Sequence, residues 1–234
     1  MEERRAPSDG HEAERLRRLR AIGRLREAYA AALLAGEDGG AERTIRDALD
    51  AGLTEGVIHD AVITPAMRRV GDLWSSGELT VADEHLATQI TLRMVALLRE
   101  SVRVAARRPE HRVLLAGLEQ ERHSVGLEMA ASVLAHGSYE VLSLGGDLPV
   151  DALPAAVERH RPSLVGLSAT LAGTARLIPA AIYAIRDVDP HVGIMIGGPA
   201  ATLRMEATPG VAVCTHVSDA VDIADALVQH AALN

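Results

Sequence analysis

Residues 113–126 decide the fold, and they read VLLAGLEQERHSVG. Four apolar residues open this stretch, and a polar loop with one histidine leads into a helical pattern. Short apolar runs of the same kind recur at residues 141–144, 164–167, 192–196 and 211–214. Helical patterns lie between or after these runs, near residues 124–135, 150–160, 174–187 and 219–231. Alternation of helices with short, continuously apolar strands predicts a parallel sheet that is covered on both faces.

Three small patches follow predicted strands of this sheet. Residues 121–126 follow the first strand, Ser168 and Thr170 end the third, and Gly197-Gly198 end the fourth. Between these patches lie 41 residues, from Gly126 to Ser168, and then 26 residues, from Thr170 to Gly197. Ligands bind parallel sheets at the carboxyl ends of the strands. The patches therefore predict one narrow slot, with hydroxyl groups and bare glycines along it.

His123 is the candidate metal ligand of this slot. A neutral imidazole can coordinate a metal through one nitrogen, while a neighbouring carboxylate such as Glu121 accepts a hydrogen bond from the other. Gly126 permits close approach of a ligand above the loop. Each patch alone has an ordinary interpretation, since most loop histidines are surface residues and most Gly-Gly pairs are turns. The order and spacing of the three together favour a site.

The first half of the chain has helical periodicity instead. Helices are predicted at residues 11–35, 41–51, 54–74 and 80–106, with Thr54 as an N-cap and a kink or break at Pro65. Four helices in this span predict a bundle at residues 11–106. Residues 1–10 are expected to be a disordered tail and residues 107–111 a linker, so that the sheet domain occupies residues 112–234.

Composition excludes several classes of protein. The 234 residues carry a net charge of −8 with a pI near 5.7, so a generally basic surface for nucleic acid is absent. The arginines of residues 15–20 are diluted by glutamates and fit a solvated helix face. Cys214 is the single cysteine, which excludes an internal disulfide, and its apolar run predicts that it is buried. No apolar stretch is long enough to span a membrane, and no secretory signal begins the chain, so we expect a cytoplasmic protein.

The sheet half resembles the cobalamin-binding domain of methionine synthase, base-off mutases and corrinoid carrier proteins. That family has Asp-x-His-x-x-Gly, a Ser-x-Leu or Ser-x-Thr pair and a Gly-Gly pair at these spacings, and residues 112–231 match it except that Glu121 replaces the aspartate. The resemblance implies an α/β fold with a flavodoxin-like, Rossmann-type five-stranded parallel sheet. It also implies that His123 is the lower cobalt ligand, in place of the dimethylbenzimidazole base of the cofactor. The tail of the cofactor would enter the slot beside the hydroxyls and glycines, and the loop after the second strand would lie near the corrin. The residues that the resemblance implies for cofactor binding, besides His123, are Glu121, Gly126, Gly145, Asp147, Ser168, Thr170, Gly197 and Gly198.

A second resemblance concerns the helical half. Trp74 is the only tryptophan, and nine residues separate it from Glu84-His85. Alone, these residues could be a bundle anchor and a solvated charge. Next to a cobalamin domain they resemble the helical cap of light-sensing, adenosylcobalamin-dependent regulators that are joined to MerR-like DNA-binding heads. The resemblance implies that Trp74, Glu84 and His85 form the pocket for the upper adenosyl group, and Glu121 in place of aspartate is also similar to those sensors.

Two departures from the sensors shape the expected output. No DNA-binding head is expected in this chain, so we predict no direct contact with nucleic acid. Ser75 stands where the repressors have a histidine that captures cobalt after illumination, which leaves His85 or water open as the later ligand. We therefore expect output through a homo-oligomer or an unknown effector protein. No cysteine suits a thioether link to a bilin. A non-covalently bound bilin would leave no short motif, so biliverdin stays open as a second chromophore.

The sequence thus predicts a binding protein rather than an enzyme. In the preferred interpretation it is an adenosylcobalamin-binding photoreceptor or regulator, in which light cleaves the cobalt–carbon bond and changes conformation or assembly. The alternative is a corrinoid protein that carries a methyl group between methyltransferases. A mutase subunit is disfavoured, because a mutase needs a substrate barrel that this sequence does not contain.

Overall fold

The computed structural model describes residues 9–101, 111–200 and 208–232, which form two compact units divided at residues 94 and 95. Most of the predicted tail and linker lies outside these ranges. The tail prediction is wrong for Asp9 and Gly10, since both belong to the first helix.

The N-terminal unit is helical, as predicted. Its elements are α1 (Asp9–Leu34), α2 (Asp38–Asp50), α3 (Glu55–Ile58), the π-helical turn η1 (His59–Ile63), α4 (Thr64–Ser75) and α5 (Val81–Ser101). Apolar residues three and four apart bury one face of α2, of α4 and of the second half of α1. A buried polar chain joins three of the helices, since the Tyr29 hydroxyl donates to Thr91 Oγ1 (3.2 Å), which donates to Met67 Sδ (3.1 Å).

The predicted third helix keeps its N-cap but is not broken at Pro65. The Thr54 hydroxyl accepts a hydrogen bond from the Val57 amide at 3.4 Å, as an N-cap should. Proline has no amide hydrogen and collides with the carbonyl four residues before it. The chain avoids this conflict by widening into η1, where the Thr64 amide donates to the His59 carbonyl five residues back. Helical structure thus continues without a break from Glu55 to Ser75 and places Trp74 near its end.

The second unit contains the predicted sheet. Its strands are β1 (Arg112–Gly117), β2 (Glu140–Ser143), β3 (Leu164–Ser168), β4 (Gly193–Gly197) and β5 (Val211–Cys214). All neighbours pair in parallel in the order β2-β1-β3-β4-β5, which confirms the flavodoxin-like prediction. In this order the chain changes direction between β1 and β3, where such sheets bind their ligands.

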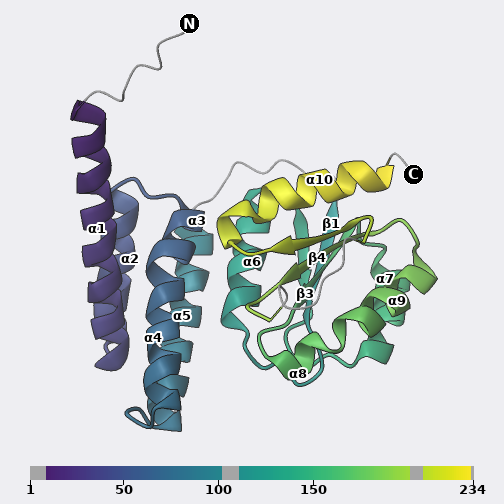
Figure 1. The fold of residues 1–234 in the computed structure, drawn as a ribbon, viewed down its shortest axis with the longest axis horizontal. Helices are drawn as coiled ribbons and strands as arrows, with labels where there is room; N and C mark the ends of the chain where they lie inside the picture. The colour runs from purple at the N-terminus through teal and green to yellow at the C-terminus, as the bar shows by residue number, and fades with distance from the viewer. Residues whose placement is uncertain (1–8, 102–110, 201–207, 233–234) are drawn as a thin grey trace, which may run out of the picture. The chain divides into compact units, whose positions relative to one another are not determined.

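Helices cover both faces of the sheet (Figure 1). α6 (Val125–His136) and α10 (Ala220–Ala232) pack on one face, and α7 (Leu153–His160), α8 (Ala172–Ala175) and α9 (Ile178–Val188) on the other. Two short 3-10 turns, η2 (Val150–Ala152) and η4 (Val217–Asp219), precede α7 and α10. The helix predicted at residues 174–187 is in fact two, because the chain turns after Ala175 and restarts with Pro179 in the first turn of α9.

The prediction that Cys214 is buried is wrong. It lies at the end of β5, the edge strand, where only one neighbouring strand covers it, and it is half-buried. Its thiol donates to the carbonyl of His216 at 3.1 Å. Across the residues that the structure describes, no helix combines the length and apolarity that crossing a bilayer requires.

Candidate functional site

The sheet brings the three predicted patches to one edge. Gly117, Ser168 and Gly197 are the last residues of β1, β3 and β4, and they pair side by side in register. Residues 118–124 leave this row as the loop into α6, and His123 is the second-last residue before the helix. The patches, far apart in the sequence, therefore border the point where the sheet changes direction.

Glu121 and His123 form the centre of this edge. The Glu121 side chain is fully buried, and its Oε1 accepts hydrogen bonds from the backbone amide (3.0 Å) and ring Nδ1 (2.6 Å) of His123. Because a carboxylate accepts only, Nδ1 carries a proton, and in the neutral imidazole the lone pair is therefore on Nε2. The His123 side chain is 54% exposed, so this nitrogen is offered to a ligand outside the protein. This is the arrangement of a metal-binding imidazole oriented by a carboxylate.

The other oxygen of Glu121 is also occupied. Its Oε2 accepts from the backbone amide of Thr170. The Thr174 hydroxyl lies 3.3 Å from the same oxygen and shares its single proton between Oε2 and the Leu171 carbonyl, which is nearer at 2.7 Å. The backbone amide of Thr170 makes the contact with Glu121, and its hydroxyl stays the group that is predicted to line the slot. Thr174 was missed by the sequence analysis, because only the turn of α8 brings it back toward β1.

The surroundings of Glu121 set its charge. Burial raises the pKa of the carboxyl, but hydrogen bonds from Thr170 and His123, together with the nearby imidazole, more than offset this, so the pKa lies below its ordinary value. A charged Glu121 holds the Nδ1 proton of His123 in place. The pair thereby fixes both the direction of the ring and the tautomer that can bind a metal.

Glu121→Gln should remove this charge from the apoprotein and cost about 1.5–3 kcal/mol of unfolding free energy at neutral pH. A lowered carboxyl pKa stabilises the fold fully above the ordinary value of 4.5, and the stabilisation is lost as the pH falls through the folded-state value. The stability difference between wild type and variant should therefore shrink below pH 4.5. Urea unfolding at several pH values measures it, and an equal difference at neutral and acid pH would contradict the assignment.

The loop after β2 supports the histidine loop. The Asp147 amide donates to the Glu121 carbonyl (2.9 Å), and the Gln120 amide donates to Asp147 Oδ1 (2.8 Å). A Cβ at Gly146 would collide with the backbone oxygen of Glu121, so the two loops touch through bare backbone. Gly145 and Asp147 both have left-handed backbones at the turn between them. Of the residues predicted near the corrin, Asp147 thus holds the histidine loop in its place.

The predicted glycines differ in the space beside them. A Cβ at Gly197 would have no atom nearer than 3.9 Å, and one at Gly126 would have none within 4 Å. Gly198 has a φ of +103°, and a Cβ there would collide with the Ala169 carbonyl. Open space therefore borders Gly197 and Gly126, whereas Gly198 is required by the backbone itself.

Two exposed apolar side chains lie at the same edge. Leu144 directly follows β2, and Leu171 follows β3 by three residues. Apolar side chains left in water beside a ligand-ready imidazole suit a large, partly apolar ligand better than a bare ion. In the described part of the chain no three His, Cys, Asp or Glu side chains gather as a metal cage.

The bundle residues singled out by the sequence lie around one turn of the N-terminal unit. Trp74 is in the last turn of α4 and is 48% exposed, so it is not a core anchor of the bundle. The turn that follows is held by Ser76, whose hydroxyl bonds to the Leu73 carbonyl (3.0 Å) and to the Glu78 carboxylate (2.9 Å). An exposed tryptophan on a well-ordered turn is a surface prepared for contact.

Glu84 and His85 stand near the start of α5, which follows the same turn. The helix start is fixed by reciprocal bonds, since Asp83 Oδ2 accepts from the Thr80 amide (2.9 Å) and the Asp83 amide donates to the Thr80 hydroxyl (3.2 Å). Glu84 accepts from the Thr88 hydroxyl (2.9 Å) and pairs with His85 Nδ1 (2.9 Å). The His85 side chain is 73% exposed, so its imidazole stays accessible beside this carboxylate.

Comparison with known proteins identifies the class that this fold and site define. The model of a B12 binding domain matches residues 25–99, and a second B12 binding domain model matches residues 111–224. The two matches cover the helical half and the sheet half separately. The chain is thus a cobalamin-binding protein built from two B12-binding domains.

Several proteins of that class are similar to this chain in sequence or in fold. The chain is 36% identical over 157 residues to the HTH-type transcriptional repressor CarH of Myxococcus xanthus, across 66% of this chain and 51% of that protein. It is 25% identical over 136 residues to the trimethylamine corrinoid protein of Methanosarcina barkeri, across 57% of this chain and 63% of that protein. It therefore spans only about half to two thirds of these relatives. The solved monomethylamine corrinoid protein of Methanosarcina barkeri has the same fold, with a TM-score of 0.73 at 16% identity over 86% of this chain and 97% of that one.

Proposed function

We propose that this protein is a light-responsive regulator that binds adenosylcobalamin. The observation that carries the proposal is the half-exposed Trp74 at the end of α4, with Glu84 and His85 at the start of the next helix, in a chain whose identity to a transcriptional repressor is higher than its identity to the corrinoid protein cited above. When bound, adenosylcobalamin supplies a cobalt–carbon bond that visible light can break.

The sheet domain supplies the lower side of the proposed site. His123 would hold the cobalt through Nε2, and Glu121, itself held by the Thr170 amide, accepts the Nδ1 hydrogen and so aims Nε2 outward. The open space at Gly197 would receive the cofactor tail beside Ser168. Leu144 and Leu171 would cover apolar parts of the corrin.

The helical unit would supply the upper side. Trp74 would pack on the adenosyl group with Glu84 and His85 beside it, so the contacts of these three residues depend on whether that group is present. A ligand shifts a protein between states only through contacts that differ between them. We therefore propose that the signal is a change in conformation or assembly, passed to a homo-oligomer or to an effector protein.

Green light should convert the dark-loaded protein to a different absorption spectrum, and the sedimentation coefficient should change with it. Free adenosylcobalamin at the same concentration is the control, because its photoproduct has water rather than protein groups around the cobalt. Loading the same protein with biliverdin and recording red absorbance tests the second chromophore, which rests on the resemblance alone. If neither the spectrum nor the sedimentation coefficient of the adenosylcobalamin-loaded protein changes on illumination, a sensor role is contradicted.

Trp74→Ala should weaken the preference for adenosylcobalamin over methylcobalamin by roughly tenfold. Covering a large apolar side chain contributes about 1.5–3 kcal/mol, and the small methyl group cannot cover an indole. Binding of the two cofactors is measured in the dark by titration. Val81→Ala, which truncates another exposed apolar residue of the same unit, should keep the preference. Equal selectivity in wild type and Trp74→Ala would remove the upper pocket from the proposal.

The alternative function is a corrinoid methyl carrier. It is supported by the 25% identity to the trimethylamine corrinoid protein and would use the same lower site. Such a carrier needs access to a small methyl group and has no use for a large aromatic cover. Retained methyl transfer from methylcobalamin to a thiol acceptor, with no selectivity for adenosylcobalamin, would favour the carrier.

A further inference from the structure

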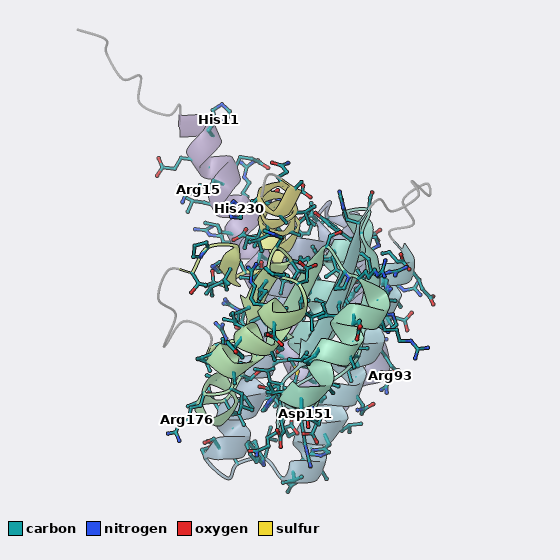
Figure 2. The ribbon with its side chains drawn as sticks, turned by 90° about the vertical axis from the view of Figure 1, so that its right-hand side faces the viewer. His11, Arg15, Arg93, Asp151, Arg176 and His230 are labelled. Atoms are coloured by element: carbon teal, nitrogen blue, oxygen red, sulfur yellow. The ribbon has the colours of Figure 1, made fainter. Side chains whose placement is uncertain are left out.

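The first half of α1 has no covering element among the described residues. Every residue from His11 to Arg20 is exposed, and the side chains of His11 and Arg15 project from the helix into the surroundings (Figure 2). Leu16 and Leu19 are 48% and 53% exposed. The second half of the same helix is packed, with Tyr29, Ala30 and Leu33 in the core of the bundle.

The exposed leucines continue the buried face of the helix. The stripe has alternating intervals of four and three residues, which keep side chains on one face and form the spacing of paired helices, and it consists of Glu12, Leu16, Leu19, Gly23, Arg26, Ala30 and Leu33. α2 and α4 contact α1, and the last two members of the stripe are buried. Its first five members form an apolar centre with a charge at each end, and we call them the α1 stripe.

The charges of the α1 stripe fit a reversed copy of itself. Glu12 and Arg26 each lie seven residues from Leu19, on opposite sides. At 1.5 Å of rise per residue, each charge is about 10 Å from the centre. Two such helices, antiparallel about Leu19, would place each Glu12 level with the partner's Arg26. The arrangement is symmetric, as a two-fold contact between identical chains requires.

Gly23 gives room for this approach. A Cβ there would meet no atom within 4 Å, so the surface at this position is open. In the antiparallel arrangement the Leu16 of one copy lies near Ile22 and Gly23 of the other. A small residue opposite a large one lets two helices interlock closely.

We infer that two copies of this chain pair through the α1 stripes as an antiparallel helix dimer centred on Leu19. The pairing needs no cofactor and goes beyond the proposed light response. Two helices in contact over about four turns bury less than the roughly 1,200–2,000 Å² of a standard stable interface. The dimer is therefore weak and forms with rising chain concentration.

Cysteine cross-linking of the full chain tests the centre of the dimer. In a Cys214→Ser background, single cysteines at positions 12, 16, 19, 23 and 26 are oxidised under mild conditions. The disulfide-linked dimer should be most abundant for Leu19→Cys, because only the central residue meets its own copy within disulfide reach. Arg17→Cys, on the opposite face of the helix, is the matched control and should give at least tenfold less dimer. Equal yields at positions 17 and 19, or a maximum elsewhere, would overturn the inference.

A charge swap tests the pairing of the ends. Glu12→Arg and Arg26→Glu should each lower the yield of the Leu19→Cys dimer several-fold, and the double variant should restore it. Leu19→Glu, exposed and so compatible with folding, should leave the chain monomeric in sedimentation at all concentrations. A chain that is monomeric before this change, or a double variant that fails to recover, would show that the stripe has another partner, such as the sheet domain of the same chain.

Discussion

Replacing His123 with alanine is expected to shift the absorption spectrum of the cobalamin-loaded protein and to weaken binding by at least tenfold. In our account Nε2 of this residue is the lower cobalt ligand, and its loss removes a direct metal bond. Even the residues that only orient metal ligands typically contribute about 10- to 100-fold to metal affinity. Absorption titration with cobalamin in the dark measures both effects.

Two comparisons make the His123→Ala result specific. His191→Ala removes an exposed imidazole next to the opposite, amino-terminal edge of β4 and should leave spectrum and affinity unchanged. The apoprotein of His123→Ala should stay folded, because Glu121 still accepts from the amides of residue 123 and Thr170 and from the Thr174 hydroxyl. If the variant binds cobalamin with the wild-type spectrum, the lower ligand has been assigned to the wrong residue.

Alanine at the two neighbouring glycines of β4 is expected to have opposite effects. Gly197→Ala should change the free energy of unfolding of the apoprotein by no more than about 1 kcal/mol, since a Cβ there meets nothing closer than 3.9 Å. It should nevertheless lower cobalamin affinity by at least tenfold, about 1.4 kcal/mol, because the methyl group enters the proposed tail slot.

Gly198→Ala should instead damage the fold. The backbone at this position has a φ of +103°, which side-chain-bearing residues rarely adopt, and the Cβ would strike the Ala169 carbonyl. Strain of this kind costs about 1–3 kcal/mol before the collision is added. Thermal unfolding of both apoproteins and titration with cobalamin separate the two roles. Normal affinity in Gly197→Ala would mean that the tail does not pass this residue.

Most of the sheet could be predicted from the sequence because its central strands are covered on both faces. β1, β3 and β4 are buried almost throughout, and a strand with two covered faces reads as an uninterrupted apolar run. The partial exposure of Cys214 could not be predicted in the same way. Its apolar run resembles the others, and only the strand order places β5 at the edge.

The site was predictable where one residue's type fixes its chemistry. His123 and Glu121 could be paired from the sequence, because they are two residues apart and a carboxylate can accept a hydrogen bond from the imidazole nitrogen that does not bind a metal. The contact of Thr174 with Glu121 spans 53 positions in the chain and depends on the path of α8, which no local pattern contains. Every residue except proline has a backbone amide, so the sequence does not indicate which amide makes a particular contact. The hydrogen bond from the Thr170 amide to Glu121 is therefore found only in the structure.

The helical half illustrates a different limit. Pro65 predicted a kink or break, but the helix is not broken there, since the segment before the proline is a π-helical turn in which the Thr64 amide donates to the carbonyl of His59. The periodicity of α1 predicted a helix correctly. It could not show that packing against α2 and α4 ends halfway along, which leaves the α1 stripe exposed.

The most direct test of the account is electron paramagnetic resonance of the cobalt(II) cofactor in protein labelled with nitrogen-15 histidine. The unpaired electron of cobalt(II) couples to the nitrogen that binds the metal from below, so the isotope of that nitrogen sets the line splitting. Coordination by a histidine of the protein predicts doublets in the labelled sample and triplets in the unlabelled one, and His123→Ala should lose the doublets. Triplets in both samples would show that the cofactor keeps its own base, which would contradict the proposed role of His123.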